Sequence, residues 1–202
     1  MFRPRTARRD LERYRAKGLD GLERRLVDCA NALGLGGARV LEIGGGIGAI
    51  QSELLESGAA RGEVVELVGS YEAYAYELAR ERGLEGRVSY RVADVLDASG
   101  DVQPADVVVL NRVVCCSPDG IELAAAAARL TQRVLLLSFP RDVVWSRAGV
   151  AVLNAGSWLM RRSFRAFVHP TATLLAAVEA EGLRFVECGN TAFWEFAAFQ
   201  RG

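Results

Sequence analysis

The sequence has 202 residues, the size of one domain or of one domain with a modest appendage, and its 25 acidic residues balance 25 basic ones. This balance gives no overall electrostatic attraction to nucleic acid or to an anionic membrane. His169 is the only histidine and Lys17 the only lysine. A three-histidine metal site, a catalytic histidine pair and a lysine base in the core are therefore excluded, and we expect no bound metal.

The cysteines and the apolar runs bear on where the protein acts. No two cysteines have CxxC spacing, which argues against a zinc knuckle and a disulfide scaffold and favours a reducing cytoplasm. The N-terminal segment is rich in arginine and lacks the apolar core of a secretory signal. The longest apolar window, 149–160, contains Asn154 and Ser157 and is shorter than the roughly 20 residues of a membrane span, so we expect no stable membrane insertion.

Helical spacing of apolar residues predicts two N-terminal helices, Thr6–Lys17 and Leu22–Leu33, which a glycine-rich break at 34–37 ends. Short apolar runs then alternate with helical stretches, which is typical of βαβ units and a mostly parallel sheet. The runs lack a two-residue alternation, as strands covered on both faces do. The predicted strands are Arg39–Ile43, Glu63–Leu67, Arg87–Val92, Asp106–Leu110 and Arg133–Phe139, and the helices between them are Ile47–Ser57, Tyr71–Arg82 and Gly120–Gln132.

The end of the chain predicts a helix at Pro170–Glu181 and then two strands, Leu183–Cys188 and Thr191–Phe199. Only Gly189-Asn190 separates these strands, so we expect an antiparallel pair. The segment Pro140–His169 is too long for an ordinary connection and follows a strand, so it should cover the edge of the sheet where ligands bind. We therefore predict a helical cap at 1–37 and a domain at 38–202 with a lid inserted at about 140–168.

The segment Glu42–Gly48 reads Glu-Ile-Gly-Gly-Gly-Ile-Gly and runs from a strand into a helix. Glycine permits the tight turn and a close ligand, and a helix start offers free N–H groups. No Gly-Lys-Ser/Thr follows, which excludes a P-loop, but Gly44-x-Gly46-x-x-Ala49 also satisfies a loose dinucleotide fingerprint. Glu42 would repel a pyrophosphate and suits a cationic amino group better.

Glu66 ends the next strand, about twenty residues beyond the glycines. A carboxylate at this position can accept hydrogen bonds from both ribose hydroxyls. The alternative is an acid that simply faces solvent at the end of a strand.

With Ala93-Asp94 and the strand that ends at Asn111, these residues resemble the successive motifs of class I S-adenosylmethionine-dependent methyltransferases, from about Arg39 to Phe199. The resemblance implies a Rossmann-like three-layer α/β sandwich with a mostly parallel seven-stranded sheet and a C-terminal antiparallel pair. It implies S-adenosyl-L-methionine as cofactor and methyl transfer to O, N or C of a small molecule. The residues it assigns to the cofactor are Gly44, Gly46 and Gly48 under the methionine part, Glu42 at its amino group directly or through water, Glu66 at the ribose, Asp94 at the adenine amine, and Asn111 or Arg112 at the methionyl edge, with Leu67 and Val95 beside them.

One departure from the family leaves an alternative open. The family often follows the ribose acid with a small residue or Ser-Pro, whereas Leu67 follows Glu66 here. Counting back from the following helix would put Ser70 in the place of the acid. We prefer Glu66, because only a carboxylate offers two anionic acceptors.

Methyl transfer from a sulfonium mainly requires alignment and exclusion of water, and a base helps only when the acceptor must lose a proton. His169 is the candidate base, with a capping or surface role as the alternative. Aromatic residues and arginines of the insertion would line a pocket for a planar or anionic small molecule, or else form an amphipathic lid whose arginines face water. The candidate substrate contacts are Cys116, Arg141, Trp145 and Arg165.

Two other functions stay open, an NAD-dependent oxidoreductase and a cofactor-binding module without turnover. The lone lysine lies in the predicted N-terminal helix, which argues against a tyrosine-lysine dehydrogenase site. The sequence has no Asp/Asn-Pro-Pro-Tyr/Phe motif for a flipped base, so we expect no nucleic-acid partner. We expect a monomer or a homodimer.

Overall fold

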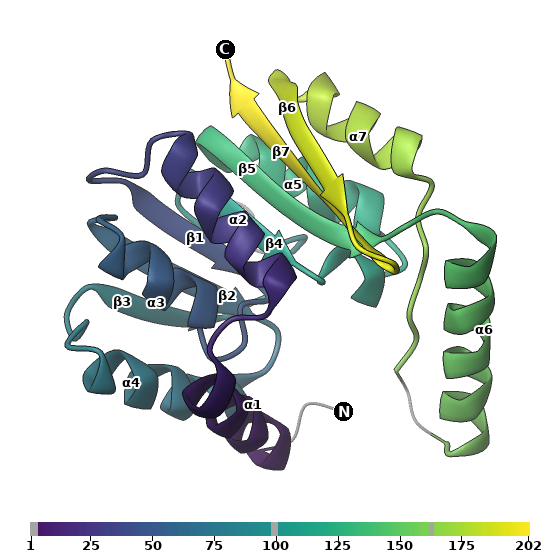
Figure 1. Cartoon of the computed structure of the whole chain (residues 1–202), viewed down its shortest axis with the longest axis horizontal. Helices are drawn as coiled ribbons and strands as arrows, with labels where there is room; N and C mark the ends of the chain where they lie inside the picture. Colours follow the sequence, from purple (N-terminus) through teal and green to yellow (C-terminus); the bar gives the residue numbers. More distant parts are fainter. Residues whose placement is uncertain (1–3, 98–100, 162–163) are drawn as a thin grey trace.

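A seven-stranded sheet with the order β3-β2-β1-β4-β5-β7-β6 forms the centre of the molecule (Figure 1). The computed structural model describes residues 4–97, 101–161 and 164–202, apart from the side chain of Cys188. Strands β1 to β5 are parallel and β6 and β7 form an antiparallel pair, as the sequence predicts. Strand β7 lies between β5 and β6 and is antiparallel to both. The strands are β1 (Arg39–Ile43), β2 (Arg61–Glu66), β3 (Val88–Val92), β4 (Ala105–Asn111), β5 (Thr131–Pro140), β6 (Leu183–Asn190) and β7 (Trp194–Arg201).

Helices cover both faces of this sheet and complete a three-layer α/β sandwich. One face carries α1 (Pro4–Lys17), α2 (Gly21–Ala32), α3 (Ala49–Glu56) and α4 (Glu72–Glu81), and the other carries α5 (Gly120–Arg129) and α7 (Thr171–Ala180). Helix α6 (Val144–Leu159) stands apart from both layers (Figure 1). Two short 3-10 helices, η1 (Gly69–Tyr71) and η2 (Val114–Cys116), follow β2 and β4.

Strand β4 explains why the central runs are apolar at every position. Val107 and Val109 pack into the core under α1 to α4, whereas Val108 and Leu110 pack into the core under α5 and α7. All four side chains are fully buried. The five alanines at 124–128 are buried too, and their small side chains let α5 lie close to the sheet.

Two details of the predicted strands are wrong. The turn between β6 and β7 lies at 191–193, because β6 continues through Gly189 and Asn190. A Cβ on Gly189 would lie 2.4 Å from the Phe196 ring, so this glycine makes room for a cross-strand side chain. Strand β3 is not covered on both faces, because it lies at the edge of the sheet, and Val92 is 51% exposed.

The N-terminal helices share the hydrophobic core of the sheet. Ala7 and Leu11 of α1 and Leu26 of α2 are buried in one cluster with Leu54 of α3 and Leu78 of α4. The start of α2 is fixed by a capping box, in which Asp20 and Glu23 each accept a hydrogen bond from the backbone of the other. Within the described part of the chain, no helix combines the length and the apolar character needed to span a bilayer.

Candidate functional site

A cavity of about 310 Å³ lies at the carboxyl ends of the parallel strands. Because these ends meet at one edge of the sheet, the segments after β1, β2, β3 and β4 all contribute to its wall. Nine of the ten residues predicted to contact a cofactor line it: Glu42, Gly44, Gly46, Glu66, Leu67, Asp94, Val95, Asn111 and Arg112. The tenth, Gly48, is instead the N-cap residue of α3.

The glycine loop has its shape because side chains do not fit in it. Gly44 has a φ of +66°, and a Cβ there would lie 2.6 Å from Cγ2 of Val113. A Cβ on Gly45 would lie 2.7 Å from Cδ of Glu42. The loop therefore passes directly over the Glu42 carboxyl and against the segment after β4.

Glu42 is only 3% exposed, beneath the glycine loop. The backbone N–H of Gln51, in the first turn of α3, donates to its Oε2 at 3.1 Å. The pKa of this carboxyl is raised to about 8, mainly by burial. The hydrogen bond from the Gln51 N–H lowers the pKa, whereas the negative charges of Glu23 and Glu66 raise it further. Glu42 is thus a buried acid whose protonation can change near neutral pH.

Glu66 connects the end of β2 to the glycine loop. Its Oε2 accepts a hydrogen bond from the Gly46 N–H at 3.2 Å, and its Oε1 accepts one from the Leu67 N–H at 2.9 Å. Burial raises the pKa of Glu66 even though these N–H groups lower it. Glu66 is among the described residues that line the cavity, and Ser70 is not. This favours Glu66 over Ser70 as the residue that binds the ribose.

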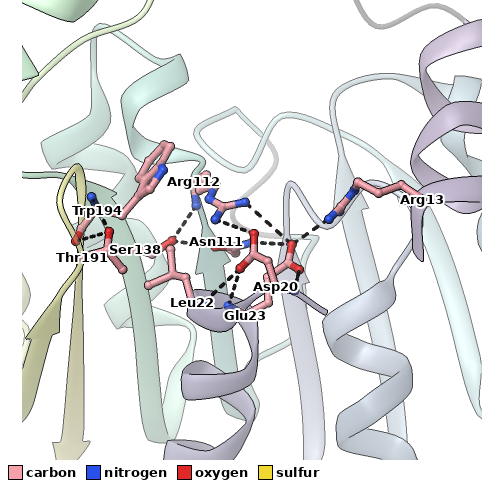
Figure 2. A network of polar contacts seen from close by, with 9 residues as sticks. All are labelled: Arg13, Asp20, Leu22, Glu23, Asn111, Arg112, Ser138, Thr191 and Trp194. Carbon is pink, nitrogen blue, oxygen red and sulfur yellow. Dashed lines mark hydrogen bonds and ion pairs between the residues drawn. The ribbon is translucent and has the colours of Figure 1, made fainter. Parts of the chain in front are cut away.

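The N-terminal helices bring three residues to the cavity that the sequence analysis did not identify, namely Asp10, Arg13 and Glu23. The Asp20-x-x-Glu23 pattern indicates where α2 begins, but local sequence does not reveal that Glu23 faces the sheet. Oε1 of Glu23 lies 3.5 Å from Nδ2 of Asn111 and 3.8 Å from the Arg13 guanidinium. Figure 2 shows this carboxylate between α1, α2 and β4.

Arg112 is held on three sides (Figure 2). Its guanidinium contacts Asp20 Oδ2 at 2.7 Å and lies over the Trp194 ring at 5.0 Å from the centroid. Its backbone N–H, at a φ of 59°, donates to Ser138 Oγ at 2.9 Å. Burial acts to raise the pKa of Asp20, but the Glu23 N–H and the Arg112 guanidinium outweigh it and lower that pKa. Arg112 therefore lines the cavity as part of a network that holds α2 to β4 and β7.

His169 lies against the start of α5. Its Nε2 is 3.0 Å from the Val114 carbonyl oxygen and 3.1 Å from that of Ser117, so Nε2 carries the hydrogen and donates to both. His169 is not among the described residues that line the cavity. These contacts give it a structural role, which is to hold η2 to the segment that leads into α7.

Of the four candidate substrate contacts, only Cys116 lines the cavity. Its Sγ is 4.0 Å from that of Cys115, and both are free thiols. Arg141 lies over the Trp145 ring at 5.9 Å from the centroid, at the base of α6. The cavity lining formed by the described residues does not include Arg141, Trp145 or Arg165.

Negative charge dominates the cavity. Its acids are Asp10, Glu23, Glu42, Glu66 and Asp94, and its basic residues are Arg13 and Arg112. The acids outnumber the basic groups even when Glu42 is protonated. Such a wall favours a cationic ligand over a pyrophosphate.

No family model and no curated protein matches this sequence. Solved structures do match. The magnesium protoporphyrin IX methyltransferase (ChlM) from Synechocystis PCC 6803 with bound SAH superposes with a TM-score of 0.69 at 21% identity, over 90% of this chain and 84% of that chain. An O-methyltransferase family 2 protein from Planctomyces limnophilus DSM 3776, in complex with apigenin, gives a TM-score of 0.72 at 18% identity, over 100% of this chain and 62% of that chain.

The [4+2]-cyclase SpnF also matches, with a TM-score of 0.65 at 13% identity, over 88% of this chain and 80% of that chain. At such low identities the similarity concerns the fold, and the cyclase indicates that one fold serves more than one reaction. The strand order, the antiparallel β7 and these superpositions all indicate the same fold. The chain has the Rossmann-like fold of the class I S-adenosylmethionine-dependent methyltransferases.

Proposed function

We propose that this protein is an S-adenosylmethionine-dependent methyltransferase that acts on a small molecule. The observation that carries the proposal is the hydrogen bond between Glu66 and the Gly46 N–H inside an acidic cavity. It joins the glycine loop to the acid at the end of β2. A dinucleotide would place a pyrophosphate at the glycine loop, beside the Glu66 carboxylate that accepts from the Gly46 N–H, and like charge disfavours this.

The cavity suits S-adenosylmethionine in size and charge. Its volume of about 310 Å³ lies within the range of small-molecule sites. Glu66 would accept hydrogen bonds from the ribose hydroxyls, Glu42 would hold the amino group, and Asp94 would bind the adenine amine. The bound cofactor supplies an electrophilic methyl group on a positively charged sulfur.

The acceptor would enter beside Cys116, Ser117 and Leu123, which line the cavity on the side of η2 and α5. The protein's part is to align the acceptor and to exclude water. We assign no general base, because His169 is not among the described residues that line the cavity. Arg141, Trp145 and Arg165 are left out of the proposed site because they are not among the described residues that line the cavity.

The helical cap at 1–37 belongs to the proposed site, because α1 and α2 supply Asp10, Arg13 and Glu23 to its wall. The domain at 38–202 supplies the glycine loop and the acids at the strand ends. The free thiols of Cys29, Cys115 and Cys116 suit a reducing compartment, for which we propose the cytoplasm.

Calorimetric titration with S-adenosylhomocysteine tests cofactor binding. We expect Glu66→Ala to weaken the affinity at least tenfold, because a hydrogen bond to a charged group contributes about 1.5–3 kcal/mol. Glu85→Ala is the matched control, since it removes an acid whose side chain is 63% exposed and which does not line the cavity. Heat with a nicotinamide dinucleotide and none with the thioether would contradict the proposal.

Turnover is tested separately, by incubating the protein with methyl-labelled S-adenosylmethionine and a metabolite extract. We expect label in a small-molecule fraction, and we expect Glu66→Ala to reduce it along with the affinity. Binding without any transferred label would identify a module that retains the cofactor and does not turn it over.

A further inference from the structure

Helix α6 carries a large apolar face that is exposed. The exposed fractions are 81% for Val144, 74% for Val152, 71% for Trp158 and 77% for Leu159. At 100° per residue, Val144, Val152 and Leu159 lie within about 80° of one another, so they form one face. Most of the large apolar side chains that are exposed in the described structure belong to this helix or to the residue after it.

The opposite face of α6 is turned inward and is mostly polar, with one buried apolar side chain, Val150. Ser146 and Ser157 are buried, and Asn154 makes two hydrogen bonds of 2.8 Å to the backbone of Ala166. Trp145 Nε1 donates to the Ala192 carbonyl at 3.4 Å. The helix is thus attached through its buried side, and the apolar side chains of Val144, Val152 and Leu159 face outward. In a helix that packs on a core the apolar face is turned inward instead.

The charge of this segment indicates what covers the apolar face. Residues 141–168 contain five arginines and one acid, Asp142. That acid is already paired with Arg147 at 2.7 Å, and the Arg147 side chain remains 62% exposed. Arg161, at the other end of the helix, is exposed as well. A partner that fits must be apolar along the middle of the helix and anionic at both ends.

We propose that α6 binds the surface of an anionic membrane, lying in the plane of the interface. A helix of 16 residues is about 24 Å long and presents Trp145 and Trp158 near its two ends, where tryptophan favours the boundary between acyl chains and headgroups. The arginines then contact lipid phosphates. This inference does not depend on the proposed function, because it rests on α6 alone.

A second copy of the chain fits this face less well. If two α6 helices paired in antiparallel fashion, Arg147 of one copy would approach the arginine-rich end of the other. Like charges would then meet at both ends of the pair. An anionic lipid surface has no such repulsion.

Vesicle flotation with the full-length protein tests the proposal. We expect binding to phosphatidylcholine vesicles with about 30 mol % phosphatidylglycerol, and at least tenfold weaker binding to pure phosphatidylcholine. Val152→Glu/Leu159→Glu should lower binding to the anionic vesicles at least tenfold. Tyr76→Glu/Val186→Glu is the matched control, because it adds the same charges at exposed apolar positions on α4 and β6.

Two further measurements complete the test. Arg161→Gln should weaken binding to the anionic vesicles roughly fivefold, since one arginine near such a surface contributes about 1 kcal/mol. Thermal unfolding should not distinguish the glutamate variants from the parent chain, because the substituted side chains on α6 are mostly exposed. The proposal would be overturned if Val152→Glu/Leu159→Glu bound the anionic vesicles as tightly as the parent protein. Equal binding of the parent to both kinds of vesicle, or no binding to either, would overturn it as well. A dimer that Val152→Glu/Leu159→Glu dissociates, without vesicle binding, would assign the face to a second copy.

Discussion

At the scale of single residues, Glu42 links the site to the stability of the protein. Its pKa rises from 4.5 to about 8, mainly through burial. The folded state therefore binds a proton at Glu42 that the unfolded state releases above pH 4.5. The stability of the ligand-free protein should fall as the pH rises from about 4.5 to 8, and this part of the dependence should level off above that range.

Glu42→Gln should remove this dependence. We expect the stability of the variant relative to the parent to increase between pH 5 and pH 8, as measured by thermal unfolding. Binding of S-adenosylhomocysteine to the parent should tighten over the same range, because the amino group favours the charged carboxylate, whereas the variant should bind with a flat profile. Glu85→Gln, which changes an exposed acid, serves as the control. Parallel profiles for parent and Glu42→Gln would mean that Glu42 is already ionised at pH 5.

At the scale of elements, two acidic side chains at the start of α2 both cap the helix and contact the residues at the end of β4. Asp20 Oδ1 accepts hydrogen bonds from the N–H groups of Leu22 and Glu23, both at 3.0 Å, and its Oδ2 holds Arg112. Glu23 Oε2 accepts from the Asp20 N–H at 2.7 Å, while its Oε1 faces Asn111. Helix capping and the position of the loop after β4 therefore depend on the same two side chains.

Two substitutions at Asp20 separate these tasks. Asp20→Ala should cost about 1–2 kcal/mol in urea unfolding, because it removes the cap. Asp20→Asn keeps a capping oxygen and should cost less than about 1 kcal/mol, since the lost ion pair with Arg112 is partly exposed. Both should weaken S-adenosylhomocysteine binding by releasing Arg112. Equal destabilisation by the two variants would show that the ion pair, and not the cap, holds α2.

At the scale of the whole molecule, α1 is part of the main core. Leu11 and Tyr14 are buried in the cluster that includes α3 and α4, and Tyr14 donates to Glu53 at 2.7 Å. Arg15 pairs with Glu77 and Glu81 of α4. Helix α1 is therefore continuous with the core of the sheet, and we expect one unfolding transition for the whole chain.

Leu11→Ala tests this continuity. It should lower the free energy of unfolding by about 2–5 kcal/mol, because it leaves a cavity between α1 and the helices below it. Arg8→Ala is the control on the same helix, and its cost should stay within about 0.5 kcal/mol because the Arg8 side chain is 71% exposed. Circular dichroism and tryptophan fluorescence should report the same midpoint. Two separate transitions would mean that α1 and α2 fold independently of the sheet.

The sequence by itself determined the order of the seven strands along the chain and the place of the glycine loop, but it did not predict α6, which lies in the segment expected to form a lid. The bounds of β1 are those predicted, because a buried run followed by glycines is a local signal. Parallel strands of known order bring their carboxyl ends together, so Glu42, Glu66, Asp94 and Asn111 were foreseeable at one edge. The sequence placed the β6–β7 turn two residues too early, because Gly189 serves packing in β6 and not a turn.

Only the tertiary structure decided which residues complete the site. Asn111 and Glu23 are 88 residues apart in sequence, and Arg112 and Asp20 are 92 apart. Such contacts depend on how α1 and α2 pack over the sheet, which no local pattern records. The same holds for His169, whose ring faces two carbonyl oxygens, and for α6, whose attachment through Asn154 turns its apolar side outward. Periodicity reveals that a helix has two faces, but only the packing of the whole chain decides which face is buried.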